Sequence, residues 1–135
     1  IPLRLVGSEM CIRDRFATTA KERGVKVIIG AAGMAAHLCG VIASMTSIPV
    51  IGVPIKASLE GVDALYSMVQ MPPGIPVATV GINAAENAAL LAVQMMATSD
   101  EELYRRLEAY KESLKEKVVK ANRELAEVKF EHKTN

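Results

Sequence analysis

The stretch VKVIIGAAGMAAH, residues 25–37, decides the fold class of this chain. Its first part, Val25 to Gly30, is an apolar run rich in β-branched residues, which predicts a buried strand. Glycine and alanines follow, and a helix is expected from about Ala35 to Met45. A buried strand that turns through small residues into a helix is the first half of a strand–helix–strand unit.

The same alternation continues along the chain. Two further short apolar runs predict strands, and the apolar spacing between and after them predicts helices. The expected strands are 49–53 and 76–80, and the expected helices are 61–71 and 84–97. Because right-handed crossovers join such strands, the pattern predicts a doubly wound parallel sheet in a three-layer α/β/α sandwich. Three strands are few for such a sheet, so we expect it to be incomplete at the N-terminus.

The first residues differ from the rest. Residues 1–15 show no clean period, and the string LVGSEMCIRDR within them resembles adapter-derived sequence at the ends of assembled reading frames. We therefore expect 1–15 to be a non-native leader and place a partial domain at 16–98. From Arg15 to Arg23 the pattern suits the end of a helix, with Gly24 as its C-cap.

The C-terminal part is a charged helix. Of the 31 charged residues, 18 lie from Asp100 onward. Ser99 and Glu102 have the spacing of a capping box, which predicts a long helix over 99–130. Its apolar residues recur in steps of three and four, forming one narrow stripe: Leu103, Leu107, Tyr110, Leu114, Val118, Ala121, Leu125 and Val128. The helix could pack on its own domain or dock on a neighbouring subunit; its length relative to the small sheet favours an oligomer arm.

Composition excludes several classes of function. A formal net charge of +1 argues against nucleic-acid or membrane-surface partners. The two cysteines, Cys11 and Cys39, have no metal or redox spacing, which predicts free thiols in a cytoplasmic protein. No apolar run reaches the roughly 20 residues of a membrane helix. The sequence has no nucleophile elbow, no phosphate loop and no metal-spaced cluster, so we expect no metal or cofactor.

Three segments are expected at the carboxyl ends of the strands, where doubly wound sheets bind ligands. The first is the bend from Gly30 to His37, where small residues let backbone approach a ligand and the helix N-terminus offers N–H groups to an anion. His37, expected in the first helical turn, could hydrogen-bond a substrate or be a packed core histidine. The others carry Lys56, an anion contact or a solvated lysine, and Asn83, expected to cap a helix.

Four stretches carry a resemblance to a known family: AAGMAAHLCG (31–40), PVIGVPIKAS (49–58), GVDALYSMVQMPPGIPVATV (61–80) and NAALLAVQMMA (87–97). Together they resemble the bacterial-type 5-(carboxyamino)imidazole ribonucleotide mutase family, over roughly Phe16 to Lys115. The resemblance implies a flavodoxin-like subunit that assembles as a homo-octamer in purine (IMP) biosynthesis, without cofactor or metal. It implies an isomerase that moves a carboxylate from an exocyclic nitrogen to ring carbon C4 through bound CO2.

The resemblance also assigns site residues by position. It implies that Ala32 and Gly33 offer backbone groups to the ribonucleotide. It implies that His37, in a supporting role, and Leu38 line the pocket near the transferred carboxylate. The segment from Met68 to Pro73 is implied to close a site on a neighbouring subunit.

Two family motifs are absent from this sequence: the Gly-Ser-x-Ser-Asp turn and the Ser-Ala-His-Arg-Thr-Pro loop with the acid/base histidine. No residue of this chain is therefore a certain catalytic residue, and we expect an N-terminally truncated mutase with very low turnover by itself. Two alternatives remain. One is an aminoimidazole ribonucleotide carboxylase that uses CO2 directly, and the other is a non-catalytic flavodoxin-like assembly module.

Overall fold

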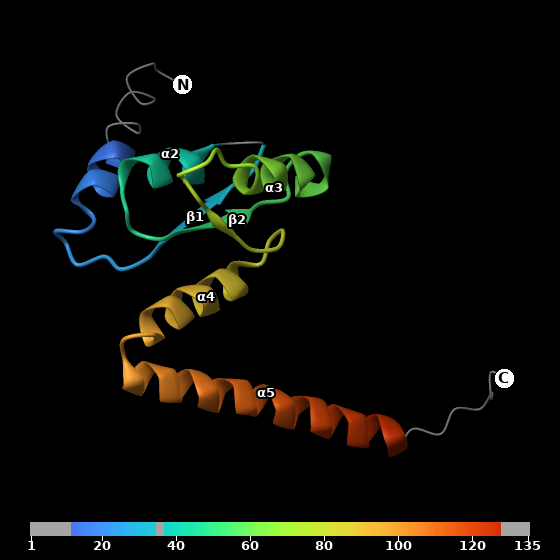
Figure 1. The fold of residues 1–135 in the computed structure, drawn as a ribbon. Helices are drawn as coiled ribbons and strands as arrows, with labels where there is room; N and C mark the ends of the chain where they lie inside the picture. The colour runs from blue at the N-terminus through green and yellow to red at the C-terminus, as the bar shows by residue number, and fades with distance from the viewer. Residues whose placement is uncertain (1–11, 35–36, 128–135) are drawn as a thin grey trace. The chain divides into compact units, whose positions relative to one another are not determined.

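The computed structural model describes residues 12–34 and 37–127. The chain divides into two compact units, and the division falls between Met96 and Ala97. The first unit holds the sheet and the helices that pack on it, and the second holds the long C-terminal helix (Figure 1).

Three parallel strands form the sheet in the order β1–β2–β3. Their bounds are Ile28–Ala32 for β1, Val50–Pro54 for β2 and Ala78–Thr79 for β3. β1 and β2 pair along their whole length, with Ile28 opposite Val50. All five residues of β2 are buried, which is why this strand reads as a continuous apolar run. The predicted α/β class with a parallel sheet is confirmed.

Helices cover both faces of this sheet (Figure 1). They are α2 (Leu38–Met45), α3 (Val62–Val69), which follows the 3₁₀ turn η1 (Leu59–Gly61), and α4 (Ala85–Ala97). One buried cluster joins α2 and α3 to the strands and contains Ile28, Cys39, Ile42, Val50 and Met68. A second joins α4 to the opposite face and contains Ile51, Val53, Ala88 and Ala92. The first unit is thus the three-layer arrangement that the alternating pattern predicts.

The N-terminal helix, over residues 12–19, ends as its sequence predicts. Gly24 adopts φ 77°, and its N–H donates to Lys21 O at 3.0 Å. The N–H of Val25 donates to Ala20 O at 3.0 Å, which completes a Schellman motif. Because Val25 is used in this cap, β1 begins at Ile28 and not at Val25 as predicted, and it runs on to Ala32.

Two other boundaries differ from the prediction for local reasons. β3 is limited to two residues, and Pro76, which has no N–H to donate, lies before it. α2 begins at Leu38 and not near Ala35, because the chain is still turning at Met34, where φ is 54°. His37 is therefore the N-cap of α2, and the prediction that it lies in the first helical turn is wrong by one position.

β1 has one neighbour among the described residues, β2. Its side chains alternate, so Ile28 and Gly30 are buried while Ile29 is 45% exposed. The face of β1 that carries Ile29 is consequently open in the part of the chain that the structure describes.

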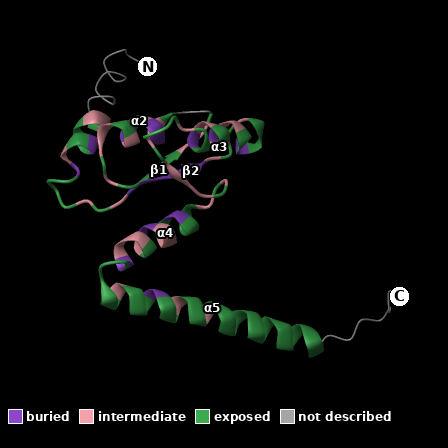
Figure 2. Cartoon of the chain, in the orientation of Figure 1, coloured by how far each residue is buried: buried purple, intermediate pink, exposed green. Residues whose placement is uncertain are grey.

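The second unit contains α5, which spans Glu101–Glu127. Asp100 caps it: its Oδ1 accepts a hydrogen bond from Leu103 N at 3.0 Å, so the helix begins one position after the predicted capping box at Ser99. Most of α5 is exposed (Figure 2), and Leu107 is its buried residue. None of the described helices combines the length and the apolarity needed to cross a membrane.

Candidate functional site

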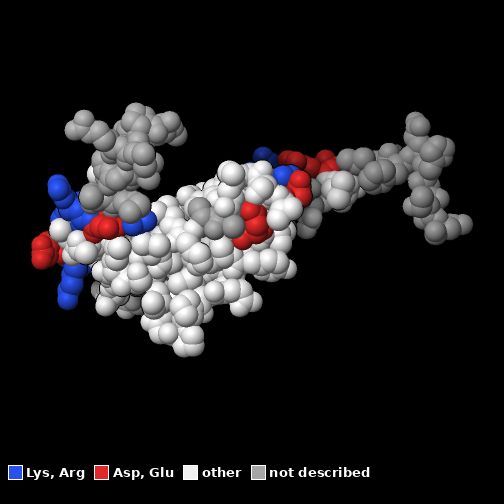
Figure 3. All heavy atoms as spheres, turned by 90° about the horizontal axis from the view of Figure 1, so that it is seen from above, with Lys and Arg blue, Asp and Glu red and all other residues white. Residues whose placement is uncertain are grey.

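The parallel register brings the carboxyl ends of the strands to one edge of the sheet. Three segments follow the strands there: 33–37 after β1, 55–58 after β2 and 80–84 after β3. The sequence predicted candidate residues in each of them. Among the described side chains of that edge, small and apolar residues predominate. Seen from above, the described surface includes a broad area without acidic or basic groups (Figure 3).

The described part of the bend after β1 packs closely against the segment that follows β2. Ala32 O accepts a hydrogen bond from Ile55 N at 2.9 Å. A Cβ added to Gly33 would lie 3.1 Å from Ile55 O and 3.0 Å from the Cβ of Ala57, so a side chain would force the segment to shift. Met34 has φ 54° and is 74% exposed. In the described part of the bend, Gly33 is therefore half-buried and Met34 is exposed close to the start of α2.

His37 is exposed at the N-cap of α2, and its side chain makes no capping hydrogen bond. A Cβ added to Gly40 would lie 3.0 Å from His37 Nδ1 and 3.1 Å from Met71 Sδ. The imidazole and the thioether therefore both border Gly40, and a larger residue there would require these side chains to move. The alternative that His37 is a packed core histidine does not hold, because the residue is exposed.

Leu38 differs from His37, because it is half-buried and packs against the core cluster of α2 and β1. Its predicted contact with a ligand stays a prediction. Met71 was predicted, as part of 68–73, to close a site on a neighbouring subunit; the structure places it beside Gly40 of its own chain, and the intersubunit role is untested.

The side chain of Cys39 connects α2 to β1. Its Sγ donates to Gly30 O at 3.3 Å, and a Cβ on Gly30 would come within 2.7 Å of that sulfur. Burial raises the pKa of the Cys39 thiol, so it stays protonated and unreactive at neutral pH. Cys39 is the predicted free thiol, and Cys11 lies outside the described residues. The small residue at position 30 thus has a packing reason that the sequence did not reveal.

The other two segments meet through Asn83. Its N–H donates to Pro54 O at 2.8 Å, and its Oδ1 accepts from Lys56 N at 2.9 Å. Asn83 is thus not the expected helix cap. Its side chain instead forms the Asn83–Lys56 tie, a hydrogen bond between residues 27 positions apart. The Lys56 ammonium forms an ion pair with Glu60, and both side chains are largely exposed. Lys56 is accordingly a solvated, paired lysine in this structure.

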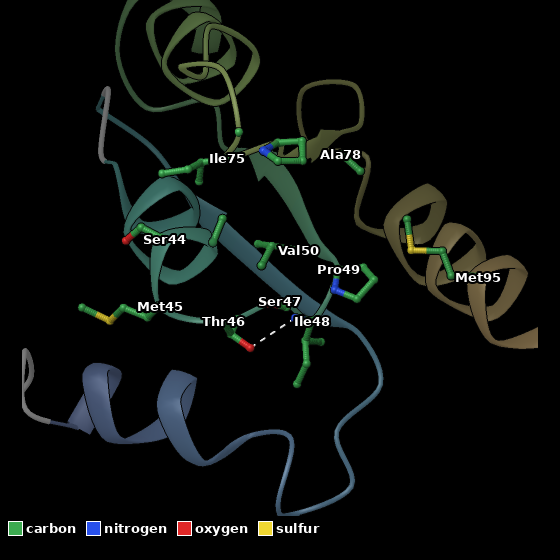
Figure 4. A pocket seen from close by; sticks show the side chains of 13 residues that line it. Ser44, Met45, Thr46, Ser47, Ile48, Pro49, Val50, Ile75, Ala78 and Met95 are labelled. Atoms are coloured by element: carbon green, nitrogen blue, oxygen red, sulfur yellow. Dashed lines mark hydrogen bonds between the residues drawn. The ribbon is translucent and has the colours of Figure 1, made fainter.

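A hollow lies at the opposite, amino end of the sheet (Figure 4). Its volume is about 740 Å³, and its lining includes Ser44, Ser47, Pro49, Ile75 and Met95. Its described lining residues include no charged side chain, and so offer no cationic group to a phosphate. We therefore place the candidate site at the carboxyl edge, where the strand-to-helix bend lies. Among the described residues, no group of three or more His, Cys, Asp or Glu is placed to hold a metal ion.

This fold and this edge define a doubly wound α/β protein with an open, glycine-containing bend before a helix. A family model described as AIR carboxylase matches residues 11–117. An N5-carboxyaminoimidazole ribonucleotide mutase from Pyrococcus abyssi is 58% identical over 101 residues, which cover 74% of this chain and 58% of that relative. The mutase of Thermotoga maritima is 47% identical over 121 residues, covering 89% of this chain and 71% of the relative.

The chain belongs to the AIR carboxylase family. The resemblance that the sequence showed is confirmed. A chloroplastic phosphoribosylaminoimidazole carboxylase from Vigna aconitifolia is also similar, 53% identical over 106 residues, which cover 78% of this chain and 19% of the relative. The chain spans less than two thirds of the length of the Pyrococcus relative.

Proposed function

We propose that this chain binds an imidazole ribonucleotide at the bend between β1 and α2 and takes part in the mutase reaction of purine biosynthesis. One observation carries the proposal. Gly33 is half-buried, and Met34 and His37 are exposed, beyond the carboxyl end of β1 and beside the first residues of α2. Backbone N–H groups and the positive end of a helix favour an anionic ligand.

The proposed reaction is an isomerisation, in which nothing is gained or lost. The bond between the exocyclic nitrogen and the carboxylate carbon breaks, releasing CO2, and the nitrogen takes up a proton. Ring carbon C4 then attacks CO2 and loses its proton. His37 is a supporting group that hydrogen-bonds the transferred carboxylate, with Ala32, Gly33 and Leu38 beside the ribonucleotide. A site that excludes water would retain CO2 between the two steps.

We propose that turnover by this chain alone is very low. The reaction needs one acid/base group to carry the proton. The sequence has two histidines, His37 and His132, and neither lies in a Ser-Ala-His-Arg-Thr-Pro loop. The chain is therefore expected to bind the ribonucleotide and to transfer the carboxylate far more slowly than a relative that carries this loop.

The experiment combines calorimetric titration of aminoimidazole ribonucleotide with an assay of carboxylate transfer on the purified chain. We expect measurable binding that weakens in His37→Ala, and turnover at least a hundredfold below the Thermotoga relative. A Lys26→Ala variant is the control, because Lys26 is exposed and lies before the amino end of β1. Absence of binding would reject the proposed site. Turnover equal to that of the Thermotoga relative would contradict the proposal that this chain lacks the acid/base group.

The relative from Vigna aconitifolia, named a carboxylase, favours a second candidate: direct carboxylation of the aminoimidazole ribonucleotide by CO2. The two reactions share the C4–carboxylate product and differ in the carboxyl donor. Labelled bicarbonate would enter the product directly in the carboxylase reaction. The label of a carboxyl-labelled carbamate substrate would be retained in the mutase reaction.

We also propose that the protein is cytoplasmic and self-associates, as an octamer, with α5 as the arm. Apolar residues of α5 recur at intervals of eleven positions. Leu107 and Val118 are one such pair, and Leu114 and Leu125 are another. Such a repeat is close to the α-helical period, so the stripe stays on one side along the helix. Val118 and Leu125 are 59% and 60% exposed, which leaves an apolar surface for a second copy.

A further inference from the structure

Backbone strain in the described residues is concentrated at the carboxyl edge of the sheet. Four residues other than glycine have positive φ: Met34 after β1, Leu59 and Glu60 after β2, and Asn83 after β3. Left-handed backbone is unfavourable for such residues and is maintained only where the surroundings hold it. The three turns at this edge are therefore held in place by specific contacts.

Asn83 supplies the contacts that join two of these turns. Its left-handed conformation, φ 59°, lets its own N–H reach Pro54 O at 2.8 Å while its side-chain Oδ1 accepts from Lys56 N at 2.9 Å. The two bonds bracket Ile55, so the chain just after β2 is held at two points by one residue. Asparagine suits both tasks, since it tolerates the left-handed region and carries an acceptor oxygen.

The segment that Asn83 holds is packed on both sides. On one side, Ile55 N donates to Ala32 O at 2.9 Å, and Gly33 lies so close to Ile55 and Ala57 that a Cβ would meet them at 3.0–3.1 Å. On the other side, a Cβ on Gly61 would lie 3.2 Å from Lys56 Cα and 2.8 Å from Ile82 Cγ2. A shift of 55–57 would therefore be transmitted directly to the bend at Gly33.

We propose that Asn83 is a positioning residue for ribonucleotide binding, which acts by holding segment 55–57 against the bend at Gly33. The inference rests on the proposed function, because it takes that bend as the binding site. Asn83 acts through its hydrogen bonds to the backbone of Pro54 and Lys56. We therefore propose that it affects the position of the Gly33 bend and does not itself contact the ligand.

Three variants separate the backbone and side-chain roles. Asn83→Asp keeps an acceptor oxygen and tolerates positive φ. Asn83→Gly tolerates positive φ but has no side-chain acceptor, and Asn83→Ala loses both. Asn87→Ala, an exposed asparagine on α4, is the matched control. All variants are first compared with the parent chain by circular dichroism and urea denaturation.

Two readouts are then taken on the full chain. Amide hydrogen exchange at Lys56 reports the tie directly and needs no ligand. Calorimetric titration of aminoimidazole ribonucleotide reports the site. We expect exchange at Lys56 to rise at least tenfold in the Gly and Ala variants, and affinity to fall at least fivefold, with Ala the weaker binder. The Asp variant should retain slow exchange; its added negative charge disqualifies it from the affinity comparison.

The outcomes are separable. Unchanged exchange at Lys56 in Asn83→Ala would overturn the tie, and faster exchange with unchanged affinity would overturn the positioning role. A parent chain that binds no ribonucleotide would reject the proposed function and the positioning role with it, while exchange would still decide the tie. Faster exchange and weaker binding in Asn83→Gly, with Asn87→Ala like the parent, would support the inference.

Discussion

The sheet-containing unit and α5 use opposite means to form regular structure. In the first unit, α2, α3 and α4 are short and lie on a sheet whose central strand, β2, is wholly buried. α5 is 27 residues long, with one buried residue and with ion pairs such as Lys115–Glu112 on its surface. Tertiary packing therefore maintains the first unit, whereas helix propensity, the Asp100 cap and local charge pairs maintain α5.

Because the two units are stabilised differently, each is suited to a different kind of function. Packing from several directions holds strained turns such as Asn83, so the first unit can present a defined site. α5 offers no such turns, but it presents an apolar stripe with charges around it, which suits assembly.

The largest effect is expected in the core of the first unit. Met68 is 1% exposed, and its Sδ lies where a Cβ on Gly52 would come within 2.9 Å. Met68→Ala should lower the free energy of unfolding by about 2–5 kcal/mol, because it leaves a cavity under β2. Urea denaturation followed by circular dichroism measures it.

Leu125→Ala is the matched change on α5, where the side chain is 60% exposed. It should alter the free energy of unfolding by less than about 0.5 kcal/mol at concentrations where the chain is monomeric. An equal loss of unfolding free energy in Met68→Ala and Leu125→Ala would show that the stripe of α5 is as deeply packed as the core. That result would contradict the proposed difference between the two units.

An intermediate effect is expected on assembly. Replacing Leu114 and Val118 together by Glu puts charge into the stripe and should weaken self-association at least tenfold, or about 1.4 kcal/mol. Sedimentation velocity over a concentration series measures it. Glu116→Gln, on the other side of α5, is the control and should associate like the parent. If the double variant still assembles, the arm is not α5.

The smallest effect concerns pH and Cys39. Burial raises the folded-state pKa of this thiol above its ordinary value of 9.0. The unfolded thiol therefore ionises first, so the stabilising contribution is complete below about pH 9 and is lost as pH rises toward the folded pKa. Urea denaturation between pH 7 and pH 10 should show a decline that is shallower in Cys39→Ala. A decline of equal slope in both proteins would contradict it.

Much of the fold could be predicted because the pattern is local. Apolar runs beside glycine and proline located β1, β2 and β3 and the helices between them, since burial on both faces leaves a continuous apolar signal. The ends were less predictable. Val25 reads as strand, but its N–H closes the preceding helix at Ala20, and only the folded chain shows that use.

The bend at Gly33 was predictable from the sequence, but the contacts that support it were not. Glycine and alanine after a strand indicated this bend, and Met34 within it is exposed. That the bend is a binding site stays a prediction. Nothing in the spacing indicated that Met71 would border the same glycine as His37, or that Asn83 would bond Lys56 and not serve as an ordinary cap. These partners are distant in sequence, so no periodicity connects them.

The alternation of strands and helices, the charged C-terminal helix and the family could all be read from the amino-acid sequence, because each depends on residue types at short spacing. Only the tertiary structure decided which atoms meet. Asn83 faces Lys56 because the parallel register sets neighbouring turns side by side at one edge of the sheet, and Gly30 faces Cys39 because α2 packs back on β1. Contacts of that kind arise from strand register and close packing, which are properties of the folded chain.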